Sequence, residues 1–202
     1  MNRFEKDFFE GETFDGLDAG KVANKEFFRC TFRQGKLADS RWERCSFEAC
    51  TFIECDLTRA VPVNSSLRGV TFKQCKLLGI DFSSLAINPD VTFEGSILRY
   101  VVMKDVNLRG TRFHDCEMQD AQLVESSFID ADFTGTDLTG ASFSRCELGG
   151  ADFSSARGAY FDPRQNSAKG AFVPVETAVM IAQAAGLRVA GHDDPPKRKR
   201  RP

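Results

Sequence analysis

Large apolar side chains recur at every fifth residue through most of this chain of 202 residues. Two residues before each of them stands a mostly small side chain, and the remaining three positions are mostly polar. A period of five matches neither the 3.6 residues per turn of an α-helix nor the two-residue alternation of a flat strand. We call the large residue central and the small one pre-central. The first run of central residues is Phe32, Leu37, Trp42, Phe47, Phe52, Leu57, Pro62, Leu67, Phe72, Leu77 and Phe82.

A five-residue unit with two inward positions suits a short extended segment followed by a corner. Four such units would close a square coil, and coils would stack by strand pairing about 4.8 Å apart. Residues about twenty apart should then lie above one another and match in size. One such column consists of seven phenylalanines: Phe32, Phe52, Phe72, Phe93, Phe113, Phe133 and Phe153.

The other three columns follow the same spacing. The step from Phe72 to Phe93 is one residue longer than the others, and the turn-forming triplet Asn88-Pro89-Asp90 predicts a one-residue bulge there. The second column begins with Leu17, Leu37 and Leu57. The third column includes Ile87. The fourth column is the least regular and consists of Val22, Trp42, Pro62, Phe82, Met103, Leu123 and Phe143.

These patterns predict an all-β solenoid of about seven coils over residues 15–155. We expect residues 1–14 to form a partial coil or cap, with an irregular start because Asp15 and Lys25 fall at inward positions. Residues 156–190 are expected to form a C-terminal cap with a helix at about 174–186, opened by a proline and stopped by a glycine. Residues 191–202 are expected to be a disordered basic tail.

Several five-residue units resemble the A(D/N)LXX motif of pentapeptide-repeat proteins, and the resemblance covers residues 15–155. Examples are residues 131–135 (ADFTG), 136–140 (TDLTG) and 151–155 (ADFSS). The resemblance implies a right-handed quadrilateral β-helix. The chain is similar to the Qnr, MfpA and McbG branch of this family. Members of that branch imitate B-form DNA, bind DNA gyrase or topoisomerase IV, and dimerise through a C-terminal helical module. For this chain it implies a homodimer through an apolar helix face, and the alternative that the helix only caps the rod stays open. The face comprises Val175, Ala178, Val179, Ile181, Ala182 and Ala185.

The net charge of −2 hides an asymmetry along the chain. Residues 93–161 carry six basic and eleven acidic side chains, whereas residues 17–92 carry eleven basic and nine acidic ones. Acids twenty residues apart should stack, and such ladders of like charge cost stability unless they serve a purpose. They are either polar filler of the repeat or a surface that imitates a line of phosphates. The candidate partner-binding surface comprises Asp105, Asp115, Glu117, Asp120, Glu125, Asp130, Asp132, Asp137 and Asp152.

The reactive side chains do not form a recognised catalytic pattern. All seven cysteines occupy pre-central positions, where a small buried thiol packs like alanine. His114 falls at an outward position and His192 in the tail, without a nucleophile or carboxylate at a recognised spacing. There is no phosphate-binding loop and no catalytic pair of acids. We therefore expect no enzyme, no metal and no cofactor.

The sequence also bears on location and partners. We expect a cytoplasmic protein without membrane contact, because no apolar run approaches the roughly 18 residues of a span and the N-terminus is not a signal peptide. The leading functional hypothesis is a DNA mimic that binds gyrase or topoisomerase IV and confers quinolone or peptide-antibiotic resistance by protecting it from poisons. The alternative is a non-enzymatic protein–protein interaction scaffold. Direct nucleic-acid binding through Lys197–Arg201 is a third and disfavoured possibility.

Overall fold

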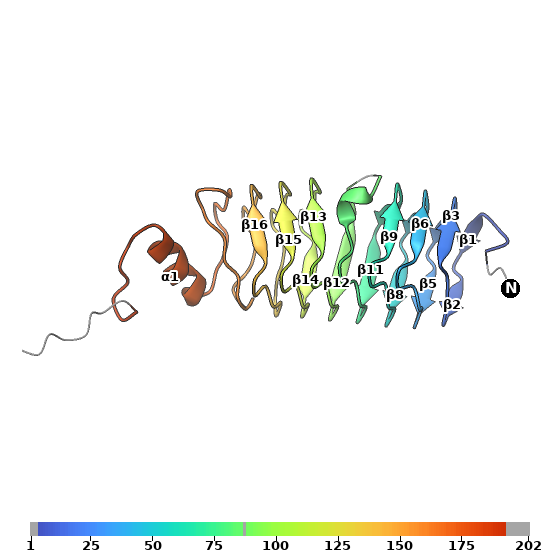
Figure 1. The fold of residues 1–202 in the computed structure, drawn as a ribbon, viewed down its shortest axis with the longest axis horizontal. Helices are drawn as coiled ribbons and strands as arrows, with labels where there is room; N and C mark the ends of the chain where they lie inside the picture. The colour runs from blue at the N-terminus through green and yellow to red at the C-terminus, as the bar shows by residue number, and fades with distance from the viewer. Residues whose placement is uncertain (1–3, 87, 193–202) are drawn as a thin grey trace, which may run out of the picture.

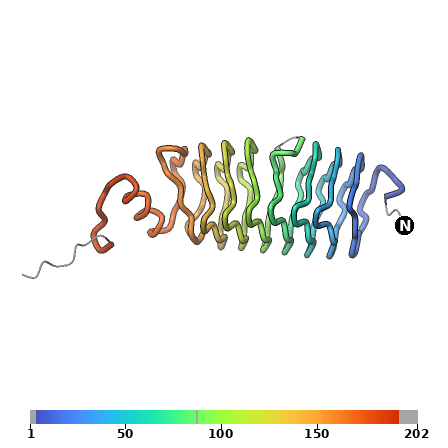
Figure 2. The backbone as a smooth tube through the Cα atoms, in the orientation of Figure 1, coloured from blue at the N-terminus to red at the C-terminus, as the bar shows by residue number. Residues whose placement is uncertain are grey.

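The chain folds into a rod of stacked square coils with one helix at its C-terminal end (Figure 1). The computed structural model describes residues 4–86 and 88–192. It is a β-solenoid of about seven coils, as the sequence predicts. Figure 2 shows the regular winding of the backbone, which one loop near the middle interrupts.

Short parallel strands form the faces of the rod. The first sheet contains β1 (Phe8–Glu10), β4 (Glu26–Phe28), β7 (Ser46–Glu48) and β10 (Ser66–Arg68). The second contains β2 (Thr13–Asp15), β5 (Thr31–Arg33), β8 (Thr51–Ile53), β11 (Val70–Lys73), β12 (Val91–Glu94) and β14 (Arg112–His114). The third contains β3 (Lys21–Ala23), β6 (Arg41–Glu43) and β9 (Val61–Val63), and the fourth β13 (Val102–Lys104), β15 (Gln122–Val124) and β16 (Ser142–Ser144). The 3₁₀-helix η1 spans Phe82–Ser84 and the α-helix α1 spans Val175–Ala184.

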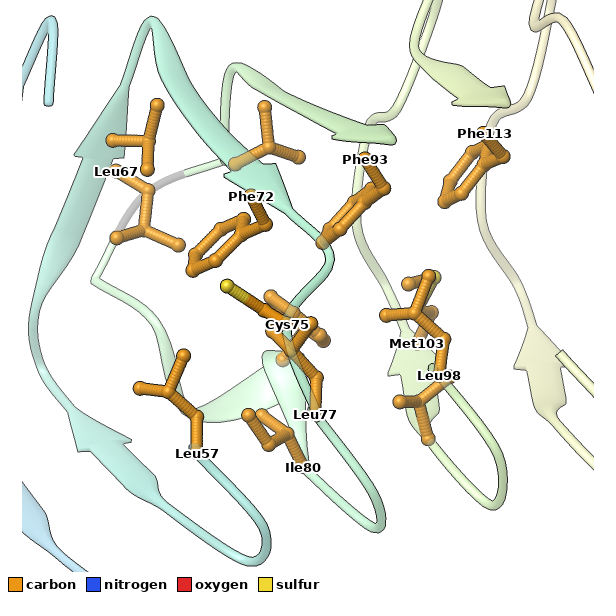
Figure 3. Packing of buried hydrophobic residues seen from close by; sticks show 14 of the residues in the cluster. Leu57, Leu67, Phe72, Cys75, Leu77, Ile80, Phe93, Leu98, Met103 and Phe113 are labelled. Carbon is orange, nitrogen blue, oxygen red and sulfur yellow. The ribbon is translucent and has the colours of Figure 1, made fainter. Parts of the chain in front are cut away.

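The predicted column of phenylalanines runs along the inside of the rod. From Phe14 to Phe153 the rings stack on successive coils, with centroids 4.5–5.3 Å apart and ring planes within 4–19° of parallel. Figure 3 shows Phe72, Phe93 and Phe113 side by side within the apolar core. Strand pairing sets the spacing and the central position sets the direction of each ring, so the register seen in the sequence is confirmed.

The one-residue bulge lies where the sequence predicts it. The backbone N–H of Ala86 donates to Ser65 O at 2.9 Å, which keeps Ala86 in the twenty-residue register. Val91 instead pairs with Val70, twenty-one residues earlier. The extra residue therefore enters between these two positions, in the segment that contains Asn88. The expected central position of Ile87 lies outside the described residues.

The start of the rod differs from the sequence-based register. Asp18 forms a bridge with Lys36, which is eighteen residues later, whereas Lys21 pairs with Arg41, which is twenty residues later. The first coil is therefore two residues short at this corner. Ala19, rather than Leu17, therefore falls opposite Leu37. The shorter coil also moves the residues before it by two positions, so the side chain of Asp15 is exposed and the prediction that it points inward was wrong.

Beyond the predicted end of the repeat the same register continues. Glu147 bridges Ser167, and Asp152 bridges Phe172. Asn166 takes a pre-central place, where its Oδ1 accepts the N–H of Cys146 at 2.8 Å. Polar side chains at such places accept an inward-pointing backbone N–H that would otherwise be buried without a partner. An amide serves this purpose as well as a hydroxyl, so a pre-central residue need not be small.

A small cavity marks the irregular fourth column. Its volume is about 40 Å³, and its lining is wholly apolar and includes Trp42, Pro62, Leu67 and Phe82. The proline ring fills less of the axis than the Phe or Leu found at other central positions. It also has no N–H to give to the ladder.

Replacing Pro62 by Leu should therefore raise the free energy of unfolding by about 1 kcal/mol, because it fills the cavity and restores a donor. Equilibrium urea unfolding measures the change. Val61→Leu is the matched control, since Val61 points outward and is 39% exposed, and it should change stability little. A Pro62→Leu protein that is less stable than the parent would contradict this account of the column.

Candidate protein-binding surface

The corners of the coils display the acidic side chains of the C-terminal half. Asp115, Asp120, Glu125 and Asp130 stand at the four corners of one coil, each in the left-handed conformation with φ of 52–57°. Each corner N–H donates to a carbonyl of the next coil, for example Asp115 to Thr134 at 2.9 Å. The tertiary ladder thus stabilises a conformation that side chains other than Gly and Asn rarely adopt.

Glycines on the next coil make room for three of these carboxylates. Gly135, Gly140 and Gly150 follow Asp115, Asp120 and Asp130 by twenty residues, and all three have positive φ. A Cβ at any of these glycines would collide with the carboxylate oxygen of the aspartate on the preceding coil. The acids therefore lie flat over the backbone of the next coil and point along the surface.

Other predicted acids are neutralised by a basic side chain on the same or a neighbouring coil. Arg145 Nε donates to Glu125 Oε1 at 2.7 Å, which places a cation below the predicted stack of Asp105 and Glu125. Asp130 pairs with Arg109 at 3.2 Å, and Asp105 lies 3.7 Å from Lys104. These contacts reduce the repulsion within the ladders and also the negative charge that a partner would meet.

Asp137 is the only one of the nine acids that is buried, and Asp132 is half-buried. Each bridges an acid one coil away, Asp132 to Asp152 and Asp137 to Glu117, as the sequence predicts. Partial burial would raise the pKa of Asp132, but hydrogen bonds from Thr134 and from His114, whose Nε2 lies 2.6 Å from Asp132 Oδ2, hold it below its usual value.

Asp137 is bound still more tightly. Burial again opposes ionisation, but hydrogen bonds from Arg157, Thr139 and Gln119 outweigh it and hold the pKa of Asp137 well below its usual range. Only 12% of its side chain is exposed. Asp137 is therefore a structural anion, and its carboxylate is already occupied by partners within the rod.

Three of the predicted residues remain as exposed acids without a basic partner among the described residues. We call Asp115, Glu117 and Asp120 the acidic strip. They follow one another around a single coil, two at corners and Glu117 on the face between them. Asp152 also has no basic partner in the described part of the chain, but it is half-buried and accepts a hydrogen bond from the N–H of Ser154. The unpaired negative charge is thus concentrated on one face of the coil.

Residues beside the acidic strip were not identified from the sequence. Tyr100 is 51% exposed at a corner with φ of 59°, and the guanidinium of Arg99 lies 5.7 Å from the centre of its ring. Two buried polar atoms among the described residues have no hydrogen-bond partner: the Nε of Arg99 and the Oε1 of Gln119. Tyr and Arg are enriched in protein interfaces. The unusual signal in the sequence was an aromatic residue at a corner position.

The predicted dimerisation residues divide between two faces of α1. Thr177 is buried and its Oγ1 donates to Ala159 O at 2.6 Å, while Ile181 packs against the core. Ile181 therefore belongs to the face that caps the rod. On the far side of the helix Val175 is 69% exposed, and Ala178 is also exposed. Val179 and Ala182 are half-buried, and Ala185 is exposed just beyond the helix.

All seven cysteines are free and buried at their pre-central positions, as predicted. Their thiols contact backbone carbonyls, for example Cys50 Sγ to Phe27 O at 3.3 Å. Burial raises the pKa of Cys50 and of Cys116 to about 12, so both are protonated at neutral pH. These thiols therefore contribute to packing rather than to a reactive surface.

Two kinds of site are absent from the described part of the chain. Within residues 4–86 and 88–192, no group of three His, Cys, Asp or Glu side chains could hold a metal ion. The same part of the chain contains no helix that is long and apolar enough to cross a membrane.

Comparison with known proteins identifies the class to which this rod belongs. The chain matches the family model described as a pentapeptide repeat region over residues 25–101 and 89–153. The chain therefore belongs to the pentapeptide-repeat family. No curated protein sequence is a significant match.

Solved structures with a similar fold have different roles. A trypsin-treated variant of QnrB1, a plasmid-mediated fluoroquinolone resistance protein, is 23% identical, with 90% of this chain and 97% of that chain covered and a TM-score of 0.45. HetL, involved in heterocyst differentiation regulation in the cyanobacterium Nostoc sp. strain PCC 7120, is 16% identical, with 84% and 88% covered and a TM-score of 0.48. At these identities and TM-scores the likeness says nothing of a shared partner.

The Asp137 network predicts a pH dependence of stability. Because the folded-state pKa of Asp137 is depressed, its contribution is present above the unfolded value of about 3.9 and is lost as the pH falls towards the folded value. Asp137→Asn should lower the unfolding free energy by about 1–3 kcal/mol at pH 7, and the difference from the parent should shrink below about pH 4. Urea unfolding across this pH range measures it. Asp152→Asn, at the same place in its unit but without a basic partner among the residues that the structure describes, should have little effect. Equal effects of the two substitutions would refute the role given to Arg157.

Proposed function

We propose that the protein is a non-enzymatic DNA mimic that binds a type II topoisomerase, DNA gyrase or topoisomerase IV. Bound there, it would protect the enzyme from poisons such as quinolones or a peptide antibiotic. The family resemblance in the sequence and the acidity of the C-terminal half support this proposal. QnrB1 is described as a fluoroquinolone resistance protein, and the present proposal places this chain in a similar role.

The acidic strip carries the proposal. Its three carboxylates are exposed and have no basic partner within residues 4–86 and 88–192, on a rod whose backbone is fixed by a continuous ladder. A rigid surface loses little conformational entropy when it binds. Duplex DNA carries one charge per about 1.7 Å of its axis, so three unpaired charges on one coil imitate it only in part. The rest of the contact with the topoisomerase must come from the shape of the coil faces.

Loss of the strip's charges should weaken the effect on the topoisomerase. The variant Asp115→Asn/Glu117→Gln/Asp120→Asn removes three charges with little change of shape, and Asn tolerates the left-handed corner. Three exposed ion pairs at about 0.5 kcal/mol each sum to about 1.5 kcal/mol, which corresponds to roughly a tenfold higher concentration for half-maximal effect. Supercoiling by gyrase and quinolone-stabilised DNA cleavage are the readouts. Asp137 is left unchanged because its substitution disturbs the fold.

A matched control removes the same number of charges from the other end of the rod. Glu10, Glu26 and Glu48 are exposed on the first sheet, and Glu10→Gln/Glu26→Gln/Glu48→Gln should act like the parent. If the parent protein at micromolar excess changes neither supercoiling nor cleavage, the topoisomerase proposal is wrong. If both triple variants lose activity equally, the strip is not the contact.

A second candidate function is an interaction scaffold for another protein. The exposed Tyr100 beside Arg99 favours it, because these residue types anchor protein interfaces without any need for acidic mimicry. The pairing of five of the nine predicted acids with basic side chains points the same way. Affinity capture that yields one other protein, but no topoisomerase subunit, and that Tyr100→Ala abolishes, would favour this candidate.

We also propose that two copies associate through the far side of α1. Val175 and Ala178 are exposed there and apolar, while Thr177 and Ile181 hold the helix on the rod. Association at this end would bring two acidic halves to the centre of a rod about 70 Å long. A DNA-binding saddle lined with positive charge would meet that acidic centre first.

Sedimentation velocity tests the dimer. The parent should sediment as a dimer at tens of micromolar, and Val175→Asp/Ala178→Glu should convert it to a monomer without loss of stability, because neither side chain packs on the coils. Met180→Glu is the control: Met180 is 46% exposed but lies off this face, and the variant should remain dimeric. A monomeric parent would refute the proposal.

A further inference from the structure

The N-terminal end of the rod presents free strand edges. Figure 1 shows β1, β2 and β3 at the end opposite α1, and each of them is the last strand of its sheet. The ring of Phe4 closes the axis at this end, with its centroid 5.7–5.8 Å from those of Phe9 and Phe14. The strand edges around that ring have no partner strand within residues 4–86 and 88–192. We propose that β1 accepts an extended segment of another protein as an additional strand, and that this segment presents basic and apolar side chains in alternation.

The outer edge of β1 presents backbone groups in the geometry that binds a strand. In the second coil the N–H of Glu26 donates to Asp7 O at 2.8 Å, and the C=O of Phe28 also accepts a hydrogen bond from the first coil. Phe8 and Glu10 stand at the same places in the first coil, opposite Glu26 and Phe28. Alternate residues of a parallel ladder bond on opposite sides, so the N–H and C=O groups of Phe8 and Glu10 point away from the rod. These four groups are the contacts that an added strand uses.

The exposed ring on β1 indicates the chemistry of the added strand. Phe8 points outward and is 50% exposed. One coil later Phe28 also points outward, but it is half-buried, and the guanidinium of Arg29 lies 4.7 Å from the centre of its ring. Among the described residues no cation covers the ring of Phe8 in this way. An apolar or basic side chain of an added strand would cover Phe8 as Arg29 covers Phe28.

The same comparison selects β1 from the three free edges. The outward side chains are Thr13 and Asp15 on β2, and Lys21 and Ala23 on β3. Neither strand has a large apolar side chain on its outer face. Only β1 therefore combines the backbone pairing with an aromatic contact.

Charge favours a basic partner over a second copy of this chain. Residues 4–15 carry five acidic side chains and one basic one. Glu10 and Glu26 lie beside Phe8 and have no basic partner in the part of the chain that the structure describes. Two such ends repel each other, whereas a lysine or arginine opposite Glu10 forms a cross-strand ion pair. The basic run Lys197–Arg201 lies outside the described residues, and it contains no apolar residue between its basic ones.

A synthetic peptide added to the full-length protein tests the proposal. The probe is KTVTKTVTK, blocked at both ends, whose lysines and valines share one face of an extended strand. We expect it to bind and to slow the hydrogen exchange of the N–H groups of Phe8 and Glu10 several-fold, because these groups become donors to the added strand. The N–H groups of β7, two coils further along the same sheet, should exchange at an unchanged rate. No binding at millimolar concentration, or binding without protection of Phe8 and Glu10, would overturn the proposal.

Two control peptides separate strand addition from attraction of charge alone. The first has the same sequence with every internal backbone nitrogen methylated, which removes the N–H donors and keeps the lysines. The second, ETVTETVTE, keeps the donors and reverses the charge. Neither should bind, and a control that binds as tightly as the probe would contradict the proposed contact.

A single substitution locates the contact on β1. Phe8→Ala should weaken binding of the probe roughly threefold, because it removes a cross-strand pair without opening the core. Phe172→Ala is the matched control, since Phe172 is 64% exposed near the other end of the rod, and it should bind the probe like the parent. Equal loss of binding in the two variants would show that the probe does not add to β1.

Charge variants separate this proposal from the proposed function, on which it does not depend. Glu10→Gln/Glu26→Gln/Glu48→Gln should weaken binding of the probe several-fold and leave the effect on the topoisomerase unchanged. The triple variant of the acidic strip should do the reverse. Probe binding that is lost with the strip rather than with the three glutamates would overturn strand addition at β1. A protein that binds the probe at β1 but does not affect the topoisomerase would refute only the proposed function.

Discussion

Parallel pairing of each coil with the next, in a register of twenty residues, determines every other feature of this protein. Backbone hydrogen bonds hold the rungs together, and they place like side chains above one another inside and outside the tube. Inside, the phenylalanines stack face to face over almost the whole rod. Local propensity would not select the left-handed corners, so their stability comes from the same ladder.

The ladder also explains how a rod with few reactive groups presents a binding surface. Outward positions are fixed in rows, so the charge at any point depends on which residue stands one coil away. Where an arginine follows an acid, as Arg157 follows Asp137, the charge is neutralised within the rod. Asp115 and Asp120 stand over glycines and have no basic partner among the described residues, so they remain available to a partner. The acidic strip is thus a consequence of the residues on two successive coils.

Much of this architecture could be predicted from the sequence, because a five-residue period has few structural solutions. The phenylalanine column and the bulge near Asn88 were predictable for that reason, and the capping helix from its proline and glycine signals. The short first coil was not, since the two missing residues lie between Asp18 and Lys21, where no strong central residue marks the phase. The ion pairs were also missed: long arginine side chains choose partners by reach and rotamer, which spacing alone does not give.

Direct contact between phenylalanine rings twenty residues apart is the central claim, and ring-to-ring nuclear Overhauser effects measure it in solution. In a deuterated protein with protonated phenylalanine rings, the account predicts successive cross-peaks linking Phe72, Phe93, Phe113 and Phe133, whose neighbouring centroids lie 4.9–5.3 Å apart. The step across the bulge, from Phe72 to Phe93, should be as strong as the others. Absence of these cross-peaks from a well-dispersed spectrum would contradict the stacked coil and everything derived from it.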